Sequence, residues 1–268
     1  MHKEGHLGIS LLLSAPFVSI FIILDLYAYL FIFLGLILTW SGLPDVDIYL
    51  QRFDSVSYSD YTYRFWPWVP VMKLTNSLMN FCGRYIDKVP EDYDLKSVTH
   101  RGLTHSIWFS IVFGLLLSII PLIYLISVIL IDNLYSLEIY NHMELLLNSN
   151  PFYLIPLMFI IGFLSVAFHC VGDIFTPTGI HFLTPRTDYG FTLDQFYAKN
   201  RVANRSALPL GFMMMTYAIF FGFAYGEVNI IYLIGGFVGL FITLIPIWLL
   251  FVKTRVGKWF YIIYDIFK

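Results

Sequence analysis

Long apolar runs alternate with polar connections along this chain. Six runs approach the roughly 20 residues that a helix needs to cross a bilayer. They span residues 7–24, 26–43, 107–131, 152–171, 208–225 and 230–252. The pattern predicts an all-α fold, a polytopic membrane helical bundle with about six transmembrane or membrane-embedded helices. Only Asp25 separates the first two runs, which are barely long enough, so they form either a tight helical hairpin or two shallow re-entrant segments.

The lysines and arginines orient this bundle. All 16 of them fall before the first run, between the second and third, between the fourth and fifth, or after the sixth. The positive-inside rule therefore predicts a multi-pass protein of the cell membrane with both termini and the two long connections in the cytoplasm. The connection 132–150 and the two short connections are then outside.

The long connection 49–99 is rich in aromatic residues of the kind that gather at membrane interfaces. These are Tyr58, Tyr61, Tyr63, Phe65, Trp66 and Trp68. Five further apolar residues follow broadly at helical spacing, namely Val69, Met72, Leu78, Met79 and Phe81. We expect an interfacial amphipathic helix in this loop, either as a packing lid over the bundle or as a lipid-facing entrance to an active site.

The amino-acid composition also indicates a protein that lies in a membrane. Of the 268 residues, 58% are hydrophobic and 13% are charged, and the mean hydropathy is +0.73. A net charge of -2 gives no reason to expect a nucleic-acid partner. Cys82 and Cys170 lie far apart without a CxxC motif, which indicates neither a disulfide framework nor a thiolate zinc site. The start of the chain has no small-residue cleavage site, so we expect the first helix to be retained.

Four polar motifs lie at the predicted cytoplasmic ends of the first four helices. They are Glu4-Gly5-His6, Leu43-Pro44-Asp45-Val46-Asp47, His100-Arg101-Gly102-Leu103-Thr104-His105, and His169-Cys170-Val171-Gly172-Asp173. Six of the seven histidines are on that side, and His142 alone is outside, where we interpret it as an ordinary loop residue.

Single motifs have ordinary explanations. His169 and Asp173 are four residues apart, so a helix presents them on one face and they can share a metal ion, although such a pair is more often a cap. Asp45 and Asp47 can hold one cation or bridge two, but can equally be solvated residues of a turn. Thr176-Pro177-Thr178-Gly179 ends the fourth helix soon after Asp173.

His100 and His105 are five residues apart, which does not align them on a straight helix. A helix that starts near Thr104, with Gly102 before it, lets His100 approach from the preceding turn. Arg101 is a candidate for holding an anionic substrate oxygen.

Together the motifs bring imidazoles and carboxylates to one side, and packing is a poor explanation because ionisable groups are costly in membranes. The predicted metal ligands are His6, Asp45, Asp47, His100, His105, His169 and Asp173. Ligands of this kind without thiolate suit zinc, which we prefer, or manganese, and seven are enough for two or three ions. His2, four residues before His6, is a further candidate.

These four motifs, in this order and spacing, resemble the YdjM-like family of membrane-bound proteins described as metal-dependent hydrolases. The resemblance covers roughly residues 1–185 and implies the same seven metal-associated positions. More distantly, the arrangement is similar to the zinc-dependent phospholipase C and single-strand nuclease superfamily, which by analogy implies a phosphodiesterase site. We treat 1–185 as the metal-site membrane domain, with the loop and helical hairpin of 186–268 packed as part of it.

Three hypotheses follow for the function. The first is a metal-dependent hydrolase that acts on a phospholipid or another phosphoester at the inner leaflet. Arg101 would stabilise the phosphate, and Asp45 or Asp47 would act as base where it is not a ligand. The second is a metal-binding regulatory membrane protein without hydrolase activity. The third, a transporter, needs polar groups near the bilayer midplane, whereas here they lie at helix ends. The sequence leaves the substrate and the oligomeric state open.

Overall fold

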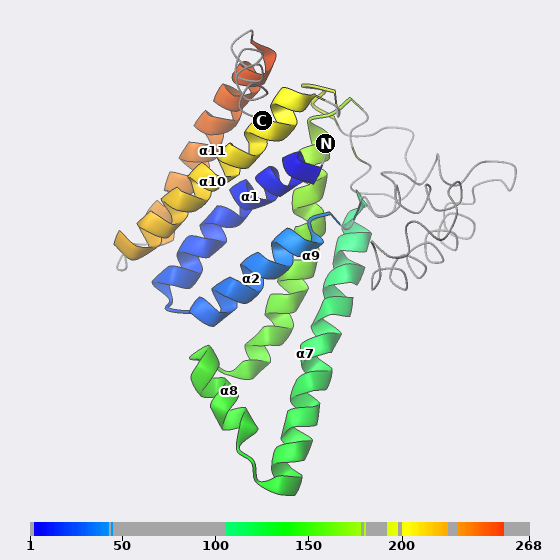
Figure 1. Cartoon of the computed structure of the whole chain (residues 1–268), viewed down its shortest axis with the longest axis vertical. Coiled ribbons are helices and arrows are strands. Elements are labelled where there is room, and N and C mark those ends of the chain that lie inside the picture. The colour runs from blue at the N-terminus through cyan, green and yellow to red at the C-terminus, as the bar shows by residue number, and fades with distance from the viewer. Residues whose placement is uncertain are drawn as a thin grey trace, which may run out of the picture.

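The computed structural model describes residues 3–42, 44, 105–177, 180, 192–197, 200–224 and 230–254 (Figure 1). These parts of the chain contain seven α-helices and no β-strand. The helices are α1 (Lys3–Ile23), α2 (Tyr27–Trp40), α7 (Ile107–Tyr135), α8 (Ile139–Leu147), α9 (Leu154–Ile174), α10 (Arg201–Ala224) and α11 (Ile230–Lys253), with a 3₁₀ turn, η4 (Pro151–Tyr153), before α9.

Each of the six predicted apolar runs coincides with a helix. Five of the helices are long and apolar enough to cross a membrane, namely α1, α7, α9 with its preceding turn, α10 and α11. The prediction of a polytopic helical membrane bundle is therefore confirmed. The interfacial helix that we predict within 49–99 lies outside the described residues.

Helices α1 and α2 form the tight hairpin that was one of the two alternatives. Asp25 turns the chain in the left-handed region, with φ of 54°, and its carboxylate accepts a hydrogen bond from the Tyr27 hydroxyl at 3.0 Å. Because α2 has 14 residues, its length is about 21 Å, which is short of the roughly 30 Å hydrocarbon core of a bilayer. Helix α2 is therefore too short to cross the hydrocarbon core by itself.

The connection 132–150 is more ordered than the sequence pattern indicated. It contains α8, and His142 is an exposed residue of that helix rather than a loop residue. The Asp132 carboxylate accepts hydrogen bonds from the backbone N–H groups of Ile139 at 2.9 Å and Tyr140 at 2.7 Å. This bidentate cap satisfies the first donors of α8 and so fixes where the helix begins.

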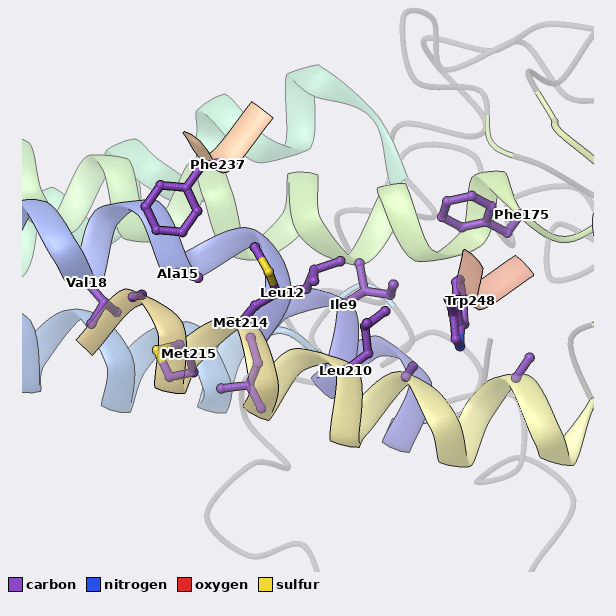
Figure 2. Packing of buried hydrophobic residues seen from close by; sticks show 14 of the residues in the cluster. Ile9, Leu12, Ala15, Val18, Phe175, Leu210, Met214, Met215, Phe237 and Trp248 are labelled. Carbon is purple, nitrogen blue, oxygen red and sulfur yellow. The ribbon is translucent and has the colours of Figure 1, made fainter. Parts of the chain in front are cut away.

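Two layers of apolar packing hold the bundle together. In the first, α1 lies along α10 and α11 covers them (Figure 1). Figure 2 shows its core, where Ile9 and Leu12 of α1 meet Leu210 and Met214 of α10. In the second layer, α2 packs against α7 and α9. Helix α9 adjoins both layers, because it also contacts α1.

Glycines allow two of these helix pairs to approach closely. A Cβ atom on Gly8 would lie 2.3 Å from the carbonyl carbon of Ala207, so α1 and α10 touch through their backbones. A Cβ atom on Gly162 would lie 2.7 Å from the Cα of Gly114, so α9 and α7 do the same. Close approach at small residues is the usual way in which helices associate in lipid, where no hydrophobic effect drives them together.

Candidate metal centre

Three separate segments bring ionisable side chains together at one end of the bundle. His6 lies in the first turns of α1, and His169 and Asp173 lie in the last turns of α9. His105 lies just before α7, whose first turn is capped by the Ser106 hydroxyl accepting from the N–H of Phe109 at 3.2 Å. All four are buried, with exposed fractions of 1% for His6 and 0% for the others.

The three imidazoles converge on the Asp173 carboxylate. His6 Nε2 lies 3.5 Å from Oδ1, while His105 Nε2 lies 3.4 Å and His169 Nε2 lies 3.7 Å from Oδ2. The His169 to Asp173 contact confirms that residues four apart share a face of this helix. One ligand atom from each of His6, His169 and Asp173 lies within 4.8 Å of the others, so these three residues can hold a metal ion.

A backbone hydrogen bond orients one of these rings. Nδ1 of His169 lies 2.7 Å from the carbonyl oxygen of Ser41, just after α2. Because a carbonyl only accepts, Nδ1 carries the proton, and in the neutral ring Nε2 presents its lone pair toward Asp173. Such a bond from the other ring nitrogen is the usual support of a metal-binding histidine. It also ties Ser41, just after the end of α2, to the centre.

Ring and thiol contacts fix the other two histidines. The rings of His6 and His169 are stacked, with centroids 3.7 Å apart and planes 8° from parallel. His105 meets His169 edge-on at 5.0 Å. The buried Cys170 thiol donates to the carbonyl oxygen of His105 at 3.3 Å. The thiol therefore helps to hold the start of α7 against α9.

These residues fit a bound divalent ion. Two donors that lie 2.0–2.1 Å from a tetrahedral zinc ion are about 3.4 Å apart, and the observed separations from the Asp173 oxygens are 3.5, 3.4 and 3.7 Å. Imidazole and carboxylate together are also a donor set that zinc and manganese accept.

Four of the seven predicted ligands are therefore described, and they lie together: His6, His105, His169 and Asp173. Asp45, Asp47 and His100, the proposed phosphate-binding Arg101 and the further candidate His2 lie outside the described residues. Sequence reasoning missed the Ser41 carbonyl, since a backbone oxygen leaves no signal in a side-chain pattern. The contact of Cys170 with His105 had one signal, the position of Cys170 beside His169.

The chain was also compared with known proteins. No curated protein and no solved structure matches it. A family model described as YdjM inner membrane protein matches residues 1–259. The match extends beyond residues 1–185, over which the motifs are found, and includes α10 and α11. Because it covers nearly all of the 268 residues, this multi-pass chain belongs to the YdjM inner membrane protein family.

Proposed function

We propose that this protein is a membrane-bound metal-dependent hydrolase that acts on a phosphoester, such as a phospholipid, at the cytoplasmic face of the membrane. One observation carries the proposal. Three imidazole nitrogens converge on the Asp173 carboxylate at 3.4 to 3.7 Å in a buried site at the end of an apolar bundle. Ionisable groups are costly in such a place and are usually retained for function.

The described residues that would hold the ion are His6, His169 and Asp173, with His105 against the same carboxylate. Zinc is our preferred metal, and Asp45, Asp47 and His100 would extend the ligand set to two or three ions. When bound, a divalent ion supplies Lewis acidity toward a phosphoryl oxygen and makes water more acidic.

The remaining roles fall to side chains of the sequence motifs. Arg101 would bind an anionic phosphoryl oxygen through its guanidinium group. Asp45 or Asp47, where it is not a ligand, would take the proton of the attacking water. The distribution of lysine and arginine supports a cytoplasmic position for this end of the bundle. The inner leaflet would then supply phosphoesters within reach.

Metal analysis of detergent-purified protein, followed by a hydrolysis assay, tests the proposal. The wild type and a His169→Ala variant are compared with His142→Ala, a control that removes an exposed histidine of α8. Each is then mixed with vesicles of several phospholipids and with a soluble phosphodiester, and released phosphate or headgroup is measured. We expect metal and hydrolysis in the wild type and the control, and loss of both in His169→Ala.

Other outcomes would change the proposal. Protein that retains its metal but hydrolyses no lipid or phosphodiester would favour a metal-binding regulatory role. Wild-type protein that binds no divalent metal would remove the basis of both functions.

A further inference from the structure

Among the residues that the structure describes, the two most exposed leucines are neighbours at the end of α8. Leu145 is 81% exposed and Leu146 is 77% exposed, whereas the next residue, Leu147, is 6% exposed. Leu147 belongs to the buried cluster that also contains Tyr29 and Phe33 of α2. The last turn of α8 is therefore apolar on all sides, with one side chain packed on the bundle and two directed away from it. Water is an unfavourable neighbour for two adjacent leucine side chains.

Hydrogen bonds at both ends of α8 fix the direction of these side chains. The Asp132 cap ties the start of α8 to the end of α7. Just beyond the last turn, the Ser149 hydroxyl donates to the Tyr29 hydroxyl of α2 at 2.7 Å. Tyr29 in turn donates to the carbonyl oxygen of Asn150 at 3.2 Å. Because both ends of α8 are attached to neighbouring helices, the helix cannot turn to bury the exposed side of its last turn.

The same contacts give the depth of the last turn in the bundle. Helix α8 leads from the end of α7 back toward α2 and the start of α9, at the end of the bundle away from the N-terminus (Figure 1). Tyr29 is the third residue of α2, so Ser149 lies level with the first turn of that apolar helix. Leu145 and Leu146 are four and three residues before Ser149, which is about one helical turn. Asn141, in the first turn of α8, is nearer to the end of α7.

Aromatic residues mark a membrane boundary at this level. Tyr27 is the first residue of α2, and Tyr153 immediately precedes α9. Both side chains are exposed, Tyr27 by 39% and Tyr153 by 61%. Tyrosine is favoured where a membrane meets water, because its ring is apolar and its hydroxyl is polar. The boundary therefore runs past the starts of α2 and α9, where the last turn of α8 also lies.

We propose that the last turn of α8 inserts into the leaflet opposite the metal centre, with Leu145 and Leu146 among the acyl chains just below the headgroups. Helix α8 is then an interfacial helix that anchors the connection between α7 and α9 in the membrane. Its depth is the 5–10 Å or so that is typical of such helices. The two leucines extend the apolar surface of the spanning helices and need no protein partner. The anchor requires neither bound metal nor hydrolysis.

Spin labels on the full-length protein test this insertion. A nitroxide is attached to Leu145→Cys, Leu146→Cys or the control Asn141→Cys, which lies one turn before Leu145 on the same face of α8. Cys82 is replaced by alanine in all three, while Cys170 is buried and is kept. The Cys82→Ala protein by itself measures any labelling of Cys170.

The labelled proteins are placed in vesicles of phosphatidylethanolamine and phosphatidylglycerol, and collisions of each nitroxide are measured by electron paramagnetic resonance. Oxygen concentrates in the acyl chains, whereas a neutral nickel chelate stays in water. We expect the ratio of oxygen to nickel collisions to be severalfold higher at Leu145 and Leu146 than at Asn141, because only the last turn enters the chains. A ratio at Leu145 and Leu146 no higher than at Asn141 would place the last turn in water and overturn the proposal. Immobile labels that neither reagent reaches would also overturn it, because a protein, such as a second copy of this chain, would then cover the leucines.

A pair of substitutions without a label gives a second test. Leu145→Asp should lower Tm in the same vesicles by several degrees, since a carboxylate is costly among acyl chains. Leu145→Met, which keeps an apolar side chain, should leave Tm nearly unchanged. An unchanged Tm in Leu145→Asp would contradict insertion even if the labels disturbed the helix. None of these measurements involves metal or activity, so their outcome is separate from that of the proposed hydrolase.

Discussion

Helix α1 meets the rest of the bundle through two faces of opposite character. Toward α10 it presents Gly8, which touches the backbone of Ala207, and Ile22, which packs against Gly222. Toward α9 it presents His6, which stacks on His169 and reaches Asp173. The first face depends on the absence of side chains, whereas the second buries polar side chains that are costly in an apolar bundle. The α10 contact should therefore determine folding, and the α9 contact should determine metal binding.

The largest effect is expected from Gly8→Ala. The new Cβ atom would lie 2.3 Å from the carbonyl carbon of Ala207, and backbone cannot yield as a flexible side chain can. We expect a loss of about 3 kcal/mol in the free energy of unfolding, measured by denaturation in detergent.

Gly35→Ala is the matched control for this substitution. Gly35 is an exposed helical glycine of α2, and no atom lies within 4 Å of the position that a Cβ would take there, so alanine should stabilise by roughly 0.5–1 kcal/mol. Similar responses of the two variants would mean that the α1 to α10 contact does not carry the stability assigned to it.

Asp173→Asn should weaken metal binding where α1 meets α9. It removes the one described carboxylate that all three imidazoles approach. Loss of an outer-shell partner of a metal site costs about 10–100-fold in affinity, so loss of this residue should cost more than about 100-fold. Competition with a chromogenic chelator measures the affinity. Glu144→Gln, which removes an exposed carboxylate of α8, should leave it unchanged, and equal losses in both variants would exclude Asp173 as a specific ligand.

The two faces also differ in how far the sequence predicts them. Lipid requires each spanning segment to satisfy its own backbone, so apolar runs identify the helices directly. The sequence pattern did not predict helix α8, because this helix is short and lies in a polar connection. Its start depends on a cap from Asp132, seven residues before Ile139. The sequence does not reveal the backbone contact at Gly8. It contains nothing that distinguishes this glycine from one without a close neighbour, such as Gly35.

The candidate site was partly predictable for a similar reason. Spacing along one helix is enough to pair His169 with Asp173. The approach of His6 and His105 to Asp173 depends on how α1 and α7 pack on α9. The sequence indicated it only by placing these residues at the same predicted end of the bundle. The stacking of His6 on His169 and the bond from His169 to the Ser41 carbonyl are details of tertiary packing. No local sequence rule contains them.

Gly162→Ala should have a smaller effect than Gly8→Ala. The new Cβ atom would lie 2.7 Å from the Cα of Gly114, a longer distance than the 2.3 Å at Gly8, so a smaller shift of the helices relieves the overlap. We expect a loss of about 2 kcal/mol, measured as for Gly8→Ala. Gly239→Ala, on α11 with nothing within 4 Å, is the control. A greater loss for Gly162→Ala than for Gly8→Ala would reverse the ranking of the two glycine contacts.

The smallest effect should come from Trp248→Phe. The indole N–H of Trp248 on α11 donates to the Ser206 hydroxyl of α10 at 2.8 Å, and its ring packs edge-on against Phe175, two residues after Asp173. Phenylalanine keeps the ring contact and removes only the donor, so we expect a loss of about 1 kcal/mol in unfolding free energy. Metal affinity, measured by the same chelator competition, should not change, because the hydrogen bond belongs to the layer of α1, α10 and α11. A tenfold loss of affinity would instead show that this layer positions the end of α9, and the separation between a folding face and a metal-binding face would then fail.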